Sequence, residues 1–166
     1  MPERVTTLKG NPLKLAGPEL KVGDKAPDFE LTGSDLKPVT LGNGGTVRIV
    51  SVVPSLDTPV CDAQTKRFSD EVAKLPGVEV YSVSMDLPFA QSRWCGAFGV
   101  DKVKMLSDHK SASFGLNYGT LIEPLRIESR AIFVIDKNNV IQHVEYVSEV
   151  ADHPNYEPAL AVAARL

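Results

Sequence analysis

The chain contains two cysteines, and the surroundings of the first are the most specific feature of the sequence. Cys61 lies in the stretch PSLDTPVCDAQTKRF, between a run of β-branched residues and a helical pattern. Thr58 is a favourable N-cap residue, and Pro59 then takes the first helical position, where its missing N–H costs nothing. In that first turn, unpaired backbone N–H groups and the helix dipole favour a thiolate over a thiol. We therefore interpret Cys61 as a reactive nucleophile; the alternative is an inert, buried cysteine.

A thiolate at this position needs a positive charge from another part of the chain. Asp57 and Asp62 oppose ionisation of the thiol, and Lys66 and Arg67 lie too far along the expected helix to face the sulfur. The remaining candidates are Arg93, Arg126 and Arg130.

Arg130 is the arginine that we favour as the partner of Cys61. It heads the apolar run AIFVID, where a charge is unfavourable unless it finds a partner. The alternative is an exposed arginine at the end of a strand.

The second cysteine, Cys95, lies in PFAQSRWCGAFGV, near an expected helix end. It is either a second redox thiol or a packing residue beside Trp94 and Phe98. The two cysteines lack CxxC spacing, which excludes a dithiol of that type. Because the three histidines (His109, His143 and His153) lack metal-ligand spacing, we expect no metal site.

The elements that must position these residues alternate along the chain. A length of 166 residues fits one domain spanning 1–166. We expect an N-terminal hairpin within 1–17 and short extended pieces near 29–31 and 39–41. Strands are expected at 46–53, 78–86, 130–136 and 140–147. Helices are expected from Thr58 through Phe68, Val72 and Leu75, and then at 88–98, 108–116 and 155–166. This order predicts an α/β fold with a central mixed β-sheet flanked by helices.

Composition excludes some classes of partner. The formal net charge is −3, with 43% hydrophobic and 23% charged residues, so we expect no nucleic acid or membrane partner. No apolar run is long enough to span a bilayer, and the N-terminal stretch lacks a continuous apolar segment. From this we expect a cytoplasmic protein.

Several of these motifs together resemble the peroxiredoxin family. Pro54, Thr58 and Cys61 match its pattern P-x-x-x-T-x-x-C, and PSLDTPVC resembles the thiol peroxidase subfamily. The segments DLPFAQSRWCGAFGV and SRAIFVID resemble its second-cysteine region and its arginine-bearing strand, and VGDKAPDFEL is similar to the usual lead-in. The resemblance covers nearly the whole chain.

The resemblance implies a thioredoxin-like fold and the reduction of hydroperoxides. Cys61 would be the peroxidatic thiolate, Thr58 its hydrogen-bond donor, Arg130 the stabilising cation and Pro54 a shield of the pocket. Cys95 would be the resolving cysteine, forming an intramolecular Cys61–Cys95 disulfide. The resemblance further implies a homodimer, recycling by thioredoxin, and no metal or organic cofactor.

Two departures from the family pattern concern the surroundings of the pocket. Pro59 occupies a position that is often glycine in the subfamily, and the loop YGTLIEPLRIES is short and divergent. Substrate preference is therefore the property that the resemblance defines least.

Two other functions use the same cysteine pair. One is a redox-switched sensor or binding protein, and the other is a structural disulfide in an exported protein, which reducing compartments disfavour. In a redox cycle, closing the bond requires local unwinding if Cys95 lies on a separate helix, because a disulfide needs its Cα atoms within about 7 Å. Gly96 and Gly99 would ease unwinding of the second segment.

Overall fold

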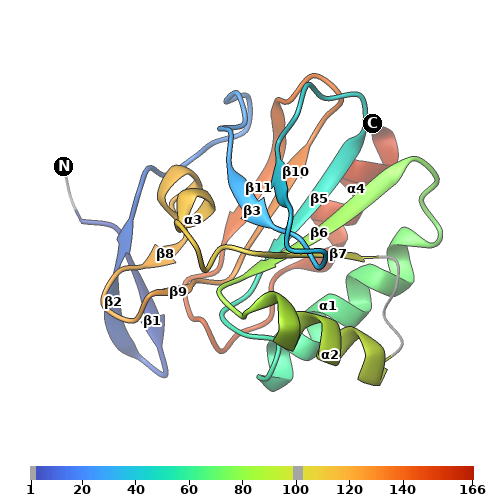
Figure 1. Cartoon of the computed structure of the whole chain (residues 1–166). Helices are drawn as coiled ribbons and strands as arrows, with labels where there is room; N and C mark the ends of the chain where they lie inside the picture. The colour runs from blue at the N-terminus through green and yellow to red at the C-terminus, as the bar shows by residue number, and fades with distance from the viewer. Residues whose placement is uncertain (1–2, 99–102) are drawn as a thin grey trace.

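A seven-stranded mixed sheet forms the centre of the molecule (Figure 1). The computed structural model describes residues 3–98 and 103–166. The strand order is β11-β10-β5-β6-β7-β3-β4. The bounds are β3 Glu30–Thr32, β4 Pro38–Thr40, β5 Val47–Val52, β6 Val78–Ser84, β7 Val103–Ser107, β10 Ala131–Ile135 and β11 Ile141–Tyr146. The expected α/β class with a central mixed sheet is confirmed.

Both faces of the sheet are covered, which explains the apolar character of its central strands. Every residue of β5 is buried. Ile49 of β5 packs into the cluster on one face, whereas Val50 packs into the cluster on the other. Ile132 and Phe133 of β10 divide between the faces in the same way. A strand buried on both sides appears as a nearly continuous apolar run in the sequence. All residues of β10 are apolar, whereas Arg48 and Ser51 interrupt the run in β5.

Helices on the two faces come from different parts of the chain. Side chains of α1 (Pro59–Val72), α2 (Pro88–Phe98) and α4 (Tyr156–Arg165) join the cluster that contains Ile49. The short helix α3 (Ser113–Tyr118) covers the opposite face, where its aromatic rings pack against Phe133. Figure 1 shows α1 and α2 close together beneath one end of the sheet. The two cysteine-bearing helices therefore share one side of the protein.

The predicted bounds of α2 match the structure, whereas those of α3 and of the end of α1 do not. The helix expected at 108–116 begins only at Ser113, because Ala112 has a left-handed backbone with φ 56°. Asp108 lies outside the helix and accepts hydrogen bonds from the N–H groups of Phe114 and Gly115. Leu75, expected within the first helix, lies beyond the end of α1.

A second, four-stranded sheet extends the N-terminal hairpin. Its order is β1 (Val5–Leu8), β2 (Asn11–Ala16), β8 (Leu121–Ile122) and β9 (Ile127–Glu128). The turn residues Lys9 and Gly10 have φ of 51° and 81°, as a two-residue hairpin turn requires. The expected hairpin is confirmed. We did not predict β8 and β9, which lie within YGTLIEPLRIES, or strand β7.

A buried carboxyl group connects this small sheet to α3. Glu128 is fully buried and accepts a hydrogen bond of 2.6 Å from the hydroxyl of Thr120. Burial raises the pKa of Glu128 well above its ordinary value, and a hydrogen bond with Asp108 and the negative charge of that residue raise it further. The protein interior thus favours the neutral form of the Glu128 carboxyl group.

None of the helices in the described ranges is long and apolar enough to cross a bilayer.

Candidate active site

Cys61 lies where the chain passes from β5 into α1, and Asp86 fixes the loop between them. The Asp86 carboxylate accepts hydrogen bonds of 2.8 Å from both the hydroxyl of Ser55 and the backbone N–H of Leu56. Asp86 lies two residues after the end of β6, and β6 pairs in parallel with β5. The start of α1 is thus tied to the carboxyl end of the neighbouring strand.

The first turn of α1 places Cys61 as the sequence predicts. Thr58 is the N-cap and Pro59 begins the helix. The Thr58 side chain makes no capping bond; its hydroxyl donates instead to the carbonyl of Ser55 at 3.0 Å. The structure therefore does not bring Thr58 into the contact with Cys61 that the resemblance implies, and that contact stays a prediction.

Arg130 is the cation beside the sulfur. Its Nη2 lies 3.2 Å from Sγ of Cys61, and its Nε donates to the carbonyl of Val150 at 2.8 Å. Arg130 is 2% exposed and Cys61 is 0% exposed, so solvent screens this pair little. The exposed strand-end alternative for Arg130 is wrong. Arg93 and Arg126, the other candidates, are exposed.

Gln64, which we did not predict from the sequence, completes the support of the guanidinium. Its Oε1 accepts from Nη1 of Arg130 at 2.9 Å, and its Nε2 donates to the hydroxyl of Ser51 in β5 at 2.7 Å. Gln64 lies one turn after Cys61 on the same helix face. That spacing is the signal that points to it in the sequence.

Tyr156 in α4 lies near the same site and was also missed. Its ring packs edge-on against Phe68 of α1, with ring centres 5.5 Å apart. Burial raises the pKa of Tyr156, the charges of Arg130 and Arg67 lower it, and that of Cys61 raises it. The phenol therefore stays protonated beside the buried pair.

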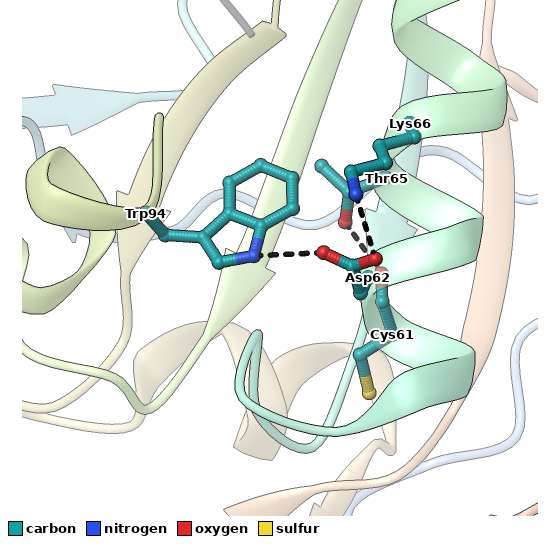
Figure 2. A network of polar contacts seen from close by, with 5 residues as sticks. All are labelled: Cys61, Asp62, Thr65, Lys66 and Trp94. Carbon is teal, nitrogen blue, oxygen red and sulfur yellow. Dashed lines mark hydrogen bonds and ion pairs between the residues drawn. The ribbon is translucent and has the colours of Figure 1, made fainter. Parts of the chain in front are cut away.

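The acidic residue next to Cys61 points away from the sulfur. Asp62 accepts from Nζ of Lys66 at 2.9 Å and from the indole Nε1 of Trp94 at 3.1 Å, as Figure 2 shows. Arg67 pairs with Glu157 of α4 at 2.6 Å. Lys66 and Arg67 thus contact carboxylates, whereas the sequence predicted only that the helix does not direct them at the sulfur.

The remaining predicted residues lie on either side of this centre. Pro54 is buried just beyond β5. Cys95, in α2, is partly buried and packs against the same cluster as Cys61. Burial raises the pKa of the Cys95 thiol. Both thiols are free in this structure. The side chain of Phe98 and residue Gly99, named above with Cys95, lie outside the described residues.

In the part of the chain that the structure describes, no group of three or more His, Cys, Asp or Glu side chains is arranged to hold a metal ion. The arrangement is that of a buried, free cysteine with a fixed cation beside it. Such a site favours a negative charge on sulfur and on an atom that reacts with it.

Comparisons with known proteins agree with this chemistry. The family model described as Redoxin matches residues 21–160. The chain is 57% identical over 158 residues to a thiol peroxidase of Halalkalibacterium halodurans, covering 95% of both chains. It is 53% identical over 161 residues to a thiol peroxidase of Bacillus subtilis, covering 96% of both. The chain belongs to the peroxiredoxin family.

Solved structures of similar proteins share the fold of this chain. A peroxiredoxin-like protein from Aquifex aeolicus superimposes with a TM-score of 0.92 at 42% identity, covering 98% of this chain and 96% of that one. A thiol peroxidase from Chromobacterium violaceum, at 20% identity, shares the fold with a TM-score of 0.86 over 97% of this chain and 95% of that one. The thioredoxin-like fold expected for a peroxiredoxin is confirmed, and the chain is a peroxiredoxin-type peroxidase.

Replacing Gln64 tests how far the peroxiredoxin site depends on the support of Arg130. Gln64→Leu leaves Nη1 of Arg130 and the Ser51 hydroxyl unpaired inside the protein, so we expect a loss of about 2–3 kcal/mol in the free energy of unfolding. Urea denaturation of the reduced protein measures it. The control is Gln142→Leu, which removes a partly buried bond of 2.8 Å to Asp136 and should cost less than about 1 kcal/mol. Equal losses in the two variants would contradict the special role of Gln64.

Proposed function

We propose that the chain reduces hydrogen peroxide and organic hydroperoxides through a sulfenic acid on Cys61, which Cys95 resolves as an intramolecular disulfide that thioredoxin reduces. The observation that supports this most directly is the 3.2 Å contact between Arg130 and the buried Cys61 sulfur. A guanidinium that is already buried and bonded stabilises developing negative charge without having to reorganise.

In the first step, the Cys61 thiolate attacks one oxygen of the peroxide. The S–O bond forms as the O–O bond breaks, and the departing oxygen takes up the proton that the thiol released on ionisation. Sulfur loses two electrons to the peroxide, giving a sulfenic acid and water or an alcohol. Arg130 would stabilise both the thiolate and the negative charge that builds on the leaving oxygen.

Thr58 and Pro54 would assist this step. The Thr58 hydroxyl lies at the N-cap, and rotation away from Ser55 would let it donate to the thiolate and place the peroxide oxygens. Pro54, buried at the end of the preceding strand, would keep water from the pocket. Exclusion of water strengthens the electrostatic effect of Arg130.

In the second step, the Cys95 sulfur attacks the Cys61 sulfur of the sulfenic acid. The S–S bond forms, the S–O bond breaks, and hydroxide leaves as water with the Cys95 proton. A dithiol reductant, thioredoxin, then returns both cysteines to thiols and is itself oxidised. Reduction by thioredoxin fits the cytoplasmic location that we expect for the chain. The family resemblance also leads us to propose that the chain forms a homodimer.

Serine variants of the two cysteines test these roles directly. After hydrogen peroxide treatment, intact mass should show wild type losing two hydrogens, Cys95→Ser gaining oxygen, and Cys61→Ser unchanged. Cys61→Ser reacting as fast as wild type would contradict the assignment. A correct mass pattern without repeated turnover in the presence of thioredoxin would favour the redox-switched sensor instead.

The contribution of Arg130 is tested by Arg130→Lys. An ammonium group lacks the planar fork that donates to Val150, Gln64 and Cys61 together, so we expect Cys61 oxidation by peroxide to slow by about 100-fold. Stopped-flow oxidation of the reduced protein gives the rate constant. Arg126→Lys, an exposed change between β8 and β9, is the matched control and should react like wild type. A rate within about twofold of wild type for Arg130→Lys would exclude Arg130 from the chemistry.

The second step should depend on pH through Cys95. Because burial raises the pKa of Cys95, its thiol is neutral near pH 7, whereas the attacking species is the thiolate. The thiolate fraction, and with it the rate of disulfide formation, should rise about tenfold per pH unit from about pH 7 to about pH 8. Rapid acid quench followed by mass measurement gives this rate. A profile that is flat over that range would mean that deprotonation of Cys95 does not limit the step.

A further inference from the structure

One hydrogen bond joins the neighbours of the two cysteines. Asp62 directly follows Cys61 in α1, and Trp94 directly precedes Cys95 in α2. The indole Nε1 of Trp94 donates to Oδ1 of Asp62 at 3.1 Å, and Figure 2 shows the two side chains reaching toward each other between the helices. Each partner of this bond therefore moves with one of the two redox residues.

The bond lies in a protected place at the helix interface. Trp94 is 5% exposed and packs in the same cluster as Cys61. The other oxygen of Asp62 accepts from Lys66 one turn along α1, at 2.9 Å, so the carboxylate is held from both sides. A shallow hollow of about 280 Å³ adjoins Trp94 and Asp62 and is lined also by residues 56–59. The contact thus connects the loop and first turn that carry Cys61 to the helix that carries Cys95.

Disulfide formation requires this arrangement to change. In the structure Cys61 is buried against Arg130, with its backbone carbonyl bonded to the Thr65 hydroxyl at 2.9 Å. We expect the Cys61 sulfur to leave Arg130 as Cys95 reaches it, because the two thiols lie on separate helices and a disulfide needs its Cα atoms within about 7 Å. Unwinding the first turn of α1 displaces Asp62, and unwinding the end of α2 displaces Trp94. Either movement breaks the bond between them.

We propose that the Asp62–Trp94 hydrogen bond is a latch that holds both cysteine segments in the peroxide-reducing arrangement and sets the rate at which the disulfide forms. This inference rests on the resolving role of Cys95 given under the proposed function. Asp62 and Trp94 are positioning residues, because neither contacts the reacting sulfur. Their bond therefore affects the second step and leaves the first step unchanged.

Four variants separate the latch from general packing. Trp94→Phe keeps an aromatic ring but removes the N–H donor. Asp62→Ala removes the acceptor, whereas Asp62→Asn keeps an oxygen that accepts from the indole. Tyr81→Phe is the matched control, because it removes another aromatic donor to a carboxylate, the 3.0 Å bond to Glu79 in β6, away from both cysteine helices.

Two measurements report on opening and on chemistry separately. Hydrogen exchange of the reduced protein follows opening of 59–65 and 88–98, with 131–135 as an internal reference. Rapid-quench mass measurement after a peroxide pulse follows sulfenic acid formation and then disulfide formation. The first readout does not depend on whether a disulfide forms.

The proposed latch predicts how each variant changes hydrogen exchange and the rate of disulfide formation. Trp94→Phe and Asp62→Ala should speed both exchange in the two cysteine segments and disulfide formation by about fivefold. Trp94→Phe, which keeps the charge of Asp62, should leave the peroxide step unchanged. In Asp62→Asn, the exchange rate and the rate of disulfide formation should both stay within about twofold of wild type. Tyr81→Phe should match wild type in both measurements.

Other results overturn the latch or the step on which it rests. Unchanged exchange in Trp94→Phe, or a slower peroxide step in that variant, overturns the latch. Faster exchange without faster disulfide formation also overturns it. A wild-type chain that never forms the disulfide, whatever its exchange, overturns the resolving role of Cys95 instead.

Discussion

Burial of the Arg130 guanidinium constrains the rest of the site. At 2% exposure its charge needs partners inside the protein, since a buried and unpaired charge costs several kcal/mol, about 3–5 when one partner is removed. Among the residues that the structure describes, its partners are the Val150 carbonyl, the Gln64 amide and the Cys61 sulfur. These come from the segment after β11 and from two positions of α1. One charge therefore fixes the relation of helix α1 to the sheet and places the sulfur.

Strand direction explains why this cation and this sulfur meet. β10 runs antiparallel to β5, and Ala131 pairs with Val52. Arg130, which directly precedes β10, therefore lies at the edge where β5 ends and the loop to Cys61 starts. Asp86, after the parallel strand β6, reaches the same edge and holds that loop. Open α/β sheets place their reactive groups at the carboxyl ends of parallel strands for this geometric reason.

Local patterns predicted the features that depend on neighbouring residues. The start of α1 follows from Thr58 and Pro59, and the need to pair a charge beside an apolar run identified Arg130. What could not be predicted depends on distant partners. β8 forms because β2 pairs with it, and β9 forms because it pairs in turn with β8. Helix α3 starts late because of the backbone at Ala112. Helix spacing places Gln64 on the same face as Cys61, but its role depends on Arg130 and Ser51, which are distant in the sequence.

The position of Trp94 has an optical consequence. It is the single tryptophan of the chain, and the structure places it beside Cys95, almost fully buried, with its indole N–H on a carboxylate. Any rearrangement that separates α1 from α2 transfers the indole to water and shifts its fluorescence emission to longer wavelength. Trp94 is thus an intrinsic fluorophore between the two thiols, and its emission reports the conformation of the redox centre without any added label.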